Sequence, residues 1–220
     1  MNRKLLAVYN RLLKEFGPQG WWPAETPFEV IVGAILTQST SWLNVEKAIR
    51  NLKKAGLLNP NGLRKVPLRR LAMLIKPALY YNVKARKLKR FMDFLYGNYD
   101  GNLDSLLSRP AGQLRDELLS VWGVGPETAD SIVLYAAHKP SFVIDAYTKR
   151  IYGRLGMLSE DASYDEAKRF FEDCLPKDVL LYQEYHALIV ELGKRYCRTK
   201  PVCGECCIRE FCEAVSKIRS

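Results

Sequence analysis

The chain has 220 residues and carries 34 Lys and Arg against 24 Asp and Glu, a formal net charge of +10. Its length allows one or two domains, and a hydrophobic content of 48% excludes wholesale disorder. The apolar run Val30–Leu36 is far shorter than the roughly 20 residues of a membrane span. The charged N-terminus lacks the apolar centre of a signal peptide. We therefore expect a cytoplasmic protein that does not enter membranes.

The positive charge is concentrated in the first half of the chain. Residues 1–110 hold 19 Lys and Arg against 7 Asp and Glu, whereas residues 111–220 hold 15 against 17. Between Lys47 and Met92 there are 14 basic side chains and no acidic one. Such a surface attracts polyanions through its electric field and through counterion release. This favours a nucleic acid as the partner over an acidic lipid or a protein.

The apolar residues recur every three to four positions, which predicts an all-α fold. Thr26, Pro27 and Glu29 have the pattern of a capped helix start, and a second helix is expected over about 42–55. From Asn82 onward the spacing predicts a helix with an apolar face directed at the core: Ala85, Leu88, Met92 and Leu95. The basic residues are expected to cover the rest of that helix: Lys84, Arg86, Lys87, Lys89 and Arg90.

Later segments complete the helical pattern. The run Phe142–Ile144 is the nearest candidate for a strand, and it is too short to seed a sheet. Ser163 and Glu166 have the spacing of a capping box. Trp122 and His186 are expected to be packed side chains.

The segment LLSVWGVGPETA, residues 118–129, predicts a tight turn between two helices. Gly123 and Gly125 allow positive φ angles and close approach of another backbone. The N–H groups of such a turn, and of a helix beginning at Pro126, can bind an anion such as phosphate. An ordinary joint between two helices has the same pattern, but the basic first half of the chain favours the phosphate site.

This segment resembles the helix-hairpin-helix of the endonuclease III superfamily of DNA glycosylases. The family's essential Asp lies in a segment similar to 142–150, and Asp145 falls in register with it. The residues alone make Asp145 a good helix N-cap, and both roles are compatible because a capping carboxylate is fixed and ionised. The resemblance implies a monovalent cation at the hairpin and contacts with double-stranded DNA from Gly123, Val124, Gly125, Thr128 and Lys149.

Four of the six cysteines have the spacing C-x5-C-x2-C-x5-C: Cys197, Cys203, Cys206 and Cys212. Without a signal peptide, disulfides are not expected. Four thiolates in a short loop instead indicate a metal centre, and zinc is the generic choice of metal. The superfamily has a similar loop, one residue longer in the first gap, that holds a [4Fe-4S] cluster. The resemblance therefore favours iron–sulfur, with Cys207 as a possible substitute for Cys206. It also implies that Arg198 and Lys200 contact DNA.

Family members that also nick DNA carry a Lys two residues after the second hairpin glycine. This Lys forms a Schiff base with the sugar. Glu127 occupies that position here, and a carboxylate cannot form an imine. The resemblance thus implies a monofunctional glycosylase that leaves an abasic site, unless another amine such as that of Lys149 takes over.

An enzyme that acts on a flipped base needs flat stacking surfaces, and electron-rich rings attract a cationic alkylated purine. Trp21-Trp22-Pro23, the segment 36–48 and Tyr80–Ala85 resemble the 3-methyladenine DNA glycosylase III branch of the superfamily. That branch also has Glu at the position of the nicking Lys. The resemblance implies a base pocket with Gln38 at the position that fills the gap in the duplex, and with Trp21, Trp22, Trp42 and Glu127.

We therefore expect an all-α protein with two helical domains, a DNA cleft between them and an iron–sulfur loop. Residues 25–136 would form the domain with the hairpin, and residues 1–24 plus 137–220 the second domain. The expected protein is a monomer that binds double-stranded DNA containing a damaged base, with Asp145 as the catalytic residue. The alternatives are a bifunctional endonuclease III-type enzyme, a mismatch uracil or thymine glycosylase, and a non-catalytic DNA-binding protein.

Overall fold

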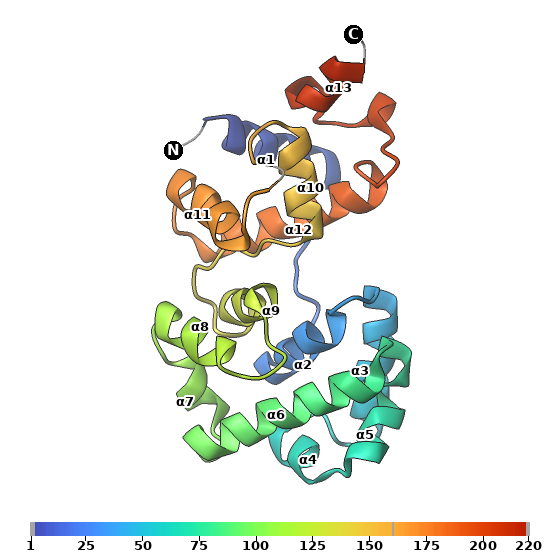
Figure 1. Ribbon diagram of the computed structural model, residues 1–220, viewed down its shortest axis with the longest axis vertical. Coiled ribbons are helices and arrows are strands. Elements are labelled where there is room, and N and C mark those ends of the chain that lie inside the picture. Colours follow the sequence, from blue (N-terminus) through green and yellow to red (C-terminus); the bar gives the residue numbers. More distant parts are fainter. Residues whose placement is uncertain (1–2, 160, 219–220) are drawn as a thin grey trace. The chain divides into compact units, whose positions relative to one another are not determined.

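The computed structural model describes residues 3–159 and 161–218, and these form helices joined by turns and loops, without a strand (Figure 1). This confirms the predicted all-α fold. The described chain divides into two compact units, one formed by Pro23–Lys139 and the other by the parts before Pro23 and from Pro140 onward.

The unit Pro23–Lys139 contains the hairpin and the basic segment. Thr26 caps its first helix, because the side chain accepts a hydrogen bond from the N–H of Glu29 at 3.1 Å. The apolar helix α2 is buried along most of its length and packs on α3, α6 and η2. The helices are α2 (Pro27–Thr37), α3 (Trp42–Lys54), α4 (Pro60–Lys65), α5 (Leu68–Leu74), η1 (Lys76–Ala78), α6 (Tyr81–Tyr99), α7 (Leu103–Leu107), α8 (Ala111–Leu119), α9 (Pro126–Ser131) and the π-helical η2 (Ile132–Ala136).

The other unit is built around α12, which packs on α1 and α10. Its core is rich in aromatic rings, such as Phe142 stacked on Phe171 with centroids 4.2 Å apart. The predicted capping box of Ser163 and Glu166 is confirmed at the start of α11. The helices are α1 (Arg3–Phe16), α10 (Ala146–Arg154), α11 (Tyr164–Cys174), α12 (Val179–Arg195), η3 (Cys203–Glu205), η4 (Arg209–Phe211) and α13 (Glu213–Ile218).

Candidate active site, hairpin and cysteine centre

The hairpin consists of α8, the turn at Gly123-Val124-Gly125, and α9. Gly123 has a φ of +89°, a conformation that L-residues with a side chain rarely adopt. A Cβ atom here would also lie 2.5 Å from Cγ of Lys87, so the α6 side chain packs directly on the turn. Glycine is therefore required at position 123 both by backbone angle and by space.

Gln38 joins the turn after α2 to this hairpin. Its amide nitrogen donates to the carbonyl of Gly123 at 3.0 Å and to the hydroxyl of Thr128 at 2.9 Å. Its amide oxygen accepts a hydrogen bond from Nζ of Lys87. Thr128 is buried, so its hydroxyl is directed at Gln38 within the protein. Of the predicted site residues, the structure thus brings Gln38, Gly123 and Thr128 together.

Two expectations about side-chain exposure in this unit are wrong. Lys84 is 2% exposed, because its Nζ donates to the carbonyls of Leu36 at 2.9 Å and Ala78 at 2.5 Å rather than facing solvent. Burial, together with the charge of Lys87, lowers the pKa of Lys84 to about 8. Trp122 is 56% exposed, since it lies in the turn before Gly123 and not on the apolar face of a helix.

The basic stretch between Lys47 and Met92 covers the surface of α3–α6 with positive charge. Lys53 pairs with Glu25 and Glu29, and Arg90 pairs with Asp93. Eleven of the fourteen basic residues are exposed: Lys47, Arg50, Lys53, Lys54, Arg64, Lys65, Arg69, Arg70, Lys76, Arg86 and Arg90. Trp42 lies at the start of α3, where its indole N–H donates to Glu46, and Glu127 is exposed in the first turn of α9.

Asp145 caps α10 in the unit that contains α12. The apolar segment before it, Phe142–Ile144, is buried and leads the chain to the helix start. Oδ1 accepts two hydrogen bonds from Thr148, one from the backbone N–H at 2.7 Å and one from the hydroxyl at 2.8 Å. Oδ2 lies 3.7 Å from Nε2 of His186. Burial alone would raise the pKa of Asp145, but His186 and the Thr148 bonds outweigh it and hold that pKa below its usual value.

His186 is the residue of this site whose role the sequence did not indicate. It is 4% exposed on α12, as expected of a packed side chain, but one ring nitrogen faces Asp145. The ring of Trp21 lies beside the imidazole with centroids 5.7 Å apart, and Nζ of Lys194 lies 5.6 Å from the centroid of Trp21. Trp22 packs against Trp21 at a centroid distance of 5.7 Å. The structure thus brings Trp21 and Trp22 near Asp145 through His186.

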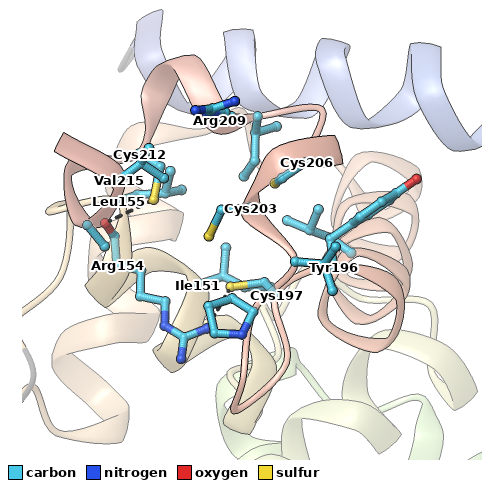
Figure 2. A pocket seen from close by; sticks show the side chains of 15 residues that line it. Ile151, Arg154, Leu155, Tyr196, Cys197, Cys203, Cys206, Arg209, Cys212 and Val215 are labelled. Atoms are coloured by element: carbon cyan, nitrogen blue, oxygen red, sulfur yellow. Dashed lines mark hydrogen bonds between the residues drawn. The ribbon is translucent and has the colours of Figure 1, made fainter. Parts of the chain in front are cut away.

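The four predicted metal ligands line one cavity of about 200 Å³. Figure 2 shows the sulfurs of Cys197, Cys203, Cys206 and Cys212 turned toward a common space. The other lining residues are mostly apolar, among them Ile151, Leu155 and Leu192. Burial is the main cause that raises the pKa of Cys206, and the charges of the neighbouring thiols raise it further. Without a positively charged metal, four thiolates gathered here would repel one another.

Cys207 is placed differently from its neighbour Cys206. It lines a neighbouring open cavity of about 700 Å³, which Cys206 and Cys212 also line, and it does not line the cavity shared by the four thiols. In residues 3–159 and 161–218, no group of three or more His, Cys, Asp or Glu side chains has the spacing that holds a single metal ion. Four thiols are a ligand set for a zinc ion and for an iron–sulfur cluster.

The remaining predicted DNA contacts are exposed side chains of the same unit. Lys149, on α10, donates to the carbonyl of Ala162 at 2.9 Å. Arg198 and Lys200 lie in the loop that follows Cys197, where Arg198 donates to the carbonyl of Lys194.

Among the residues described, no helix is long and apolar enough to span a bilayer.

Residues 32–177 match the HhH-GPD superfamily of base excision DNA repair proteins, a span that includes the hairpin and Asp145. The chain belongs to this superfamily and is a base excision repair DNA glycosylase.

Individual relatives agree with this assignment. A candidate DNA repair glycosylase of Methanocaldococcus jannaschii is 54% identical over 207 residues, which cover 93% of this chain and 94% of the relative. Endonuclease III of Thermotoga maritima is 30% identical, covering 85% of this chain and 83% of the relative. The structure of H. pylori 3-methyladenine DNA glycosylase bound to 1,N6-ethenoadenine is 29% identical with a TM-score of 0.73, covering 87% of this chain and 95% of that one.

Proposed function

We propose that the protein is a monofunctional DNA N-glycosylase that removes an alkylated purine, such as 3-methyladenine, from double-stranded DNA. The observation that carries the proposal is the partly buried, capped carboxylate of Asp145, with Oδ1 bound by Thr148 and Oδ2 outside those bonds. Glu127 at the position of the nicking Lys supports the absence of lyase activity. The similarity to the H. pylori 3-methyladenine DNA glycosylase supports the choice of base.

In the proposed reaction, the damaged base leaves the duplex stack and the bond between C1′ and the base nitrogen breaks with the electron pair going to the base. Positive charge then develops on the sugar, and the ionised Asp145 stabilises it and orients the attacking water. A preorganised carboxylate is suited to this role, because its charge need not reorganise as the cation forms. An alkylated purine is already cationic, so it departs without strong acid catalysis.

Trp21, Trp22 and Trp42 would supply stacking surfaces for the flipped base. A cationic purine gains additional attraction from the electron-rich face of an indole ring. Gln38 would fill the space that the base leaves in the duplex, and Glu127 would lie at the pocket. To enter the duplex, Gln38 would exchange its bonds to Gly123 and Thr128 for bonds to DNA.

The DNA backbone would be held by the hairpin and by basic side chains. We assign this role to the turn Gly123–Gly125 with a monovalent cation, and to Thr128, Lys149, Arg198 and Lys200. The exposed basic residues of α3–α6 would add a sequence-independent attraction to phosphate. We expect the protein to act as a monomer.

Cys197, Cys203, Cys206 and Cys212 would hold a [4Fe-4S] cluster. The residues fit the group, because their sulfurs surround one cavity of about 200 Å³ with apolar walls. The cluster would supply structural cross-linking when bound. The ligand loop would then keep Arg198 and Lys200 in place, while Arg154 donates to the carbonyl of Arg198 at 2.7 Å.

A bifunctional glycosylase that also cleaves the strand is the second candidate, favoured by the identity with Thermotoga maritima endonuclease III. An oligonucleotide panel separates the two, with 3-methyladenine, 7-methylguanine, hypoxanthine, uracil, a thymine mismatch and thymine glycol in duplex DNA. We expect release of the alkylated purines, with strand breaks only after alkali. Strand breaks without alkali, together with a borohydride-trapped protein–DNA adduct, would establish the bifunctional enzyme. Release of uracil or mismatched thymine alone would identify a mismatch glycosylase, and release of no base would indicate a non-catalytic binding protein.

A further inference from the structure

His186 lies between the carboxylate of Asp145 and the ring of Trp21. Nε2 lies 3.7 Å from Oδ2 of Asp145, and the imidazole and indole centroids are 5.7 Å apart with the planes inclined by 46°. The residue is 4% exposed and belongs to the middle of α12, whose backbone is fixed by the helix. The imidazole therefore has little freedom to turn away from the carboxylate.

The two oxygens of Asp145 have different partners. Oδ1 accepts both hydrogen bonds from Thr148, and these bonds fix that oxygen at the start of α10. Neither bond involves Oδ2, whose position depends on the groups that face it. Nε2 of His186 faces Oδ2 at 3.7 Å, so the imidazole limits the space into which this oxygen can move.

We propose that His186 is a positioning residue for Asp145, one that holds Oδ2 of the carboxylate in place. This inference rests on the catalytic role of Asp145 in the proposed function. His186 does not transfer a proton to the substrate in this scheme. It acts through the orientation and charge of Asp145, and Trp21 keeps the imidazole in place.

The groups around the imidazole of His186 determine how protonation of Asp145 depends on this residue. Asp145 faces it from the start of α10, and Trp21 from the segment before Pro23, with Lys194 beyond that ring. Tyr182 precedes His186 by one turn of α12. Because His186 helps to lower the pKa of Asp145, its removal leaves burial opposed only by the Thr148 bonds, and the carboxylate protonates at a higher pH.

The test compares His186→Leu and His186→Gln with the wild-type protein on methylated duplex DNA, by the release of 3-methyladenine. Leu removes the ring nitrogens, whereas Gln retains a polar donor. We expect His186→Leu to lower kcat about 10- to 100-fold, the loss typical of a misplaced reacting group, with KM changed less than about threefold. His186→Gln should recover part of the rate. In both variants the acid limb of the kcat profile should move to higher pH.

Tyr182→Phe is the matched control, because it removes a buried hydroxyl one turn from His186 on the same helix and keeps both the imidazole and the Thr148 bonds to Asp145. It should keep the wild-type rate and pH profile. Wild-type kcat and an unshifted acid limb in the two His186 variants would overturn the positioning role, as would a change confined to KM or to the melting temperature. If His186→Leu does not fold, the same readouts from His186→Gln decide the matter. Failure of the wild-type protein to release 3-methyladenine would instead contradict the proposed function.

Discussion

Thr148 donates two hydrogen bonds to the same oxygen of Asp145, from its backbone N–H at 2.7 Å and from its hydroxyl at 2.8 Å. The first bond is an ordinary helix cap, which many residues at position 148 could supply. The second bond requires a hydroxyl on a side chain that is fully buried. This difference makes it possible to separate the capping role of Asp145 from its chemical role.

Thr148→Val should destabilise the protein by about 1 kcal/mol, because it removes one buried hydrogen bond and keeps the cap. The Thr148 bonds help to hold the pKa of Asp145 below its usual value, so the variant raises that pKa. The ionised form then appears at higher pH, and the acid limb of the base-release rate shifts upward. Thr148→Ser retains the hydroxyl and should retain the wild-type profile. A wild-type pH profile in Thr148→Val would show that the hydroxyl bond does not lower the pKa of Asp145.

Lys84 should make the stability of the protein depend on alkaline pH. Burial lowers its pKa in the folded state to about 8, below the usual value of 10.5. Between these values the unfolded chain binds more protons than the folded protein, so stability rises with pH across this window. Urea unfolding at pH 8 and pH 10.5 should show wild-type protein gaining roughly 1–3 kcal/mol relative to Lys84→Met. An equal change in the free energy of unfolding of the two proteins between these pH values would contradict the lowered pKa of Lys84.

The cysteine centre offers an adjacent pair of residues as test and control. Cys206 lines both the cavity shared by the four thiols and the neighbouring open one, whereas Cys207 lines the open one and not the shared one. Cys206→Ser should lose brown colour, iron and sulfide and should have a lower melting temperature, whereas Cys207→Ser should resemble wild-type protein. Loss of the cluster in Cys207→Ser, with the cluster retained in Cys206→Ser, would show that Cys207 is the ligand and Cys206 is not. A colourless wild-type protein with stoichiometric zinc would contradict the iron–sulfur proposal.

The exposed basic residues of α3–α6 predict a strong effect of salt on DNA binding. Each neutralised phosphate contributes about −0.9 to the slope of log K against log salt concentration for B-DNA. With several contacts formed, we expect a slope of about −4 or steeper for an undamaged duplex, measured by fluorescence anisotropy. A nearly flat response would show that these side chains do not contact phosphate.

Local patterns in the sequence were sufficient for features that depend on neighbouring residues. The cap at Thr26, the apolar face of α6 and the capping box at Ser163 follow from spacing alone, and the structure contains all three. The cap formed by Asp145 was also readable, because its partner Thr148 is three residues away.

Contacts between segments that are distant in the sequence could not be predicted from local spacing. Lys84 occupies a position that spacing assigns to solvent, and only the carbonyls of Leu36 and Ala78, from α2 and η1, make it a buried residue. His186 is 41 positions from Asp145, so no local pattern links them. Trp122 is exposed because it lies in the turn before Gly123, where no helix face buries it.

The most direct test of the central claim is Asp145→Asn in single-turnover base release from methylated duplex DNA. Wild-type protein should release 3-methyladenine without a borohydride-trapped adduct. Asp145→Asn, which keeps an oxygen for the helix cap, should react at least about 100-fold more slowly while still binding the duplex. Base release by Asp145→Asn at the wild-type rate would contradict the account.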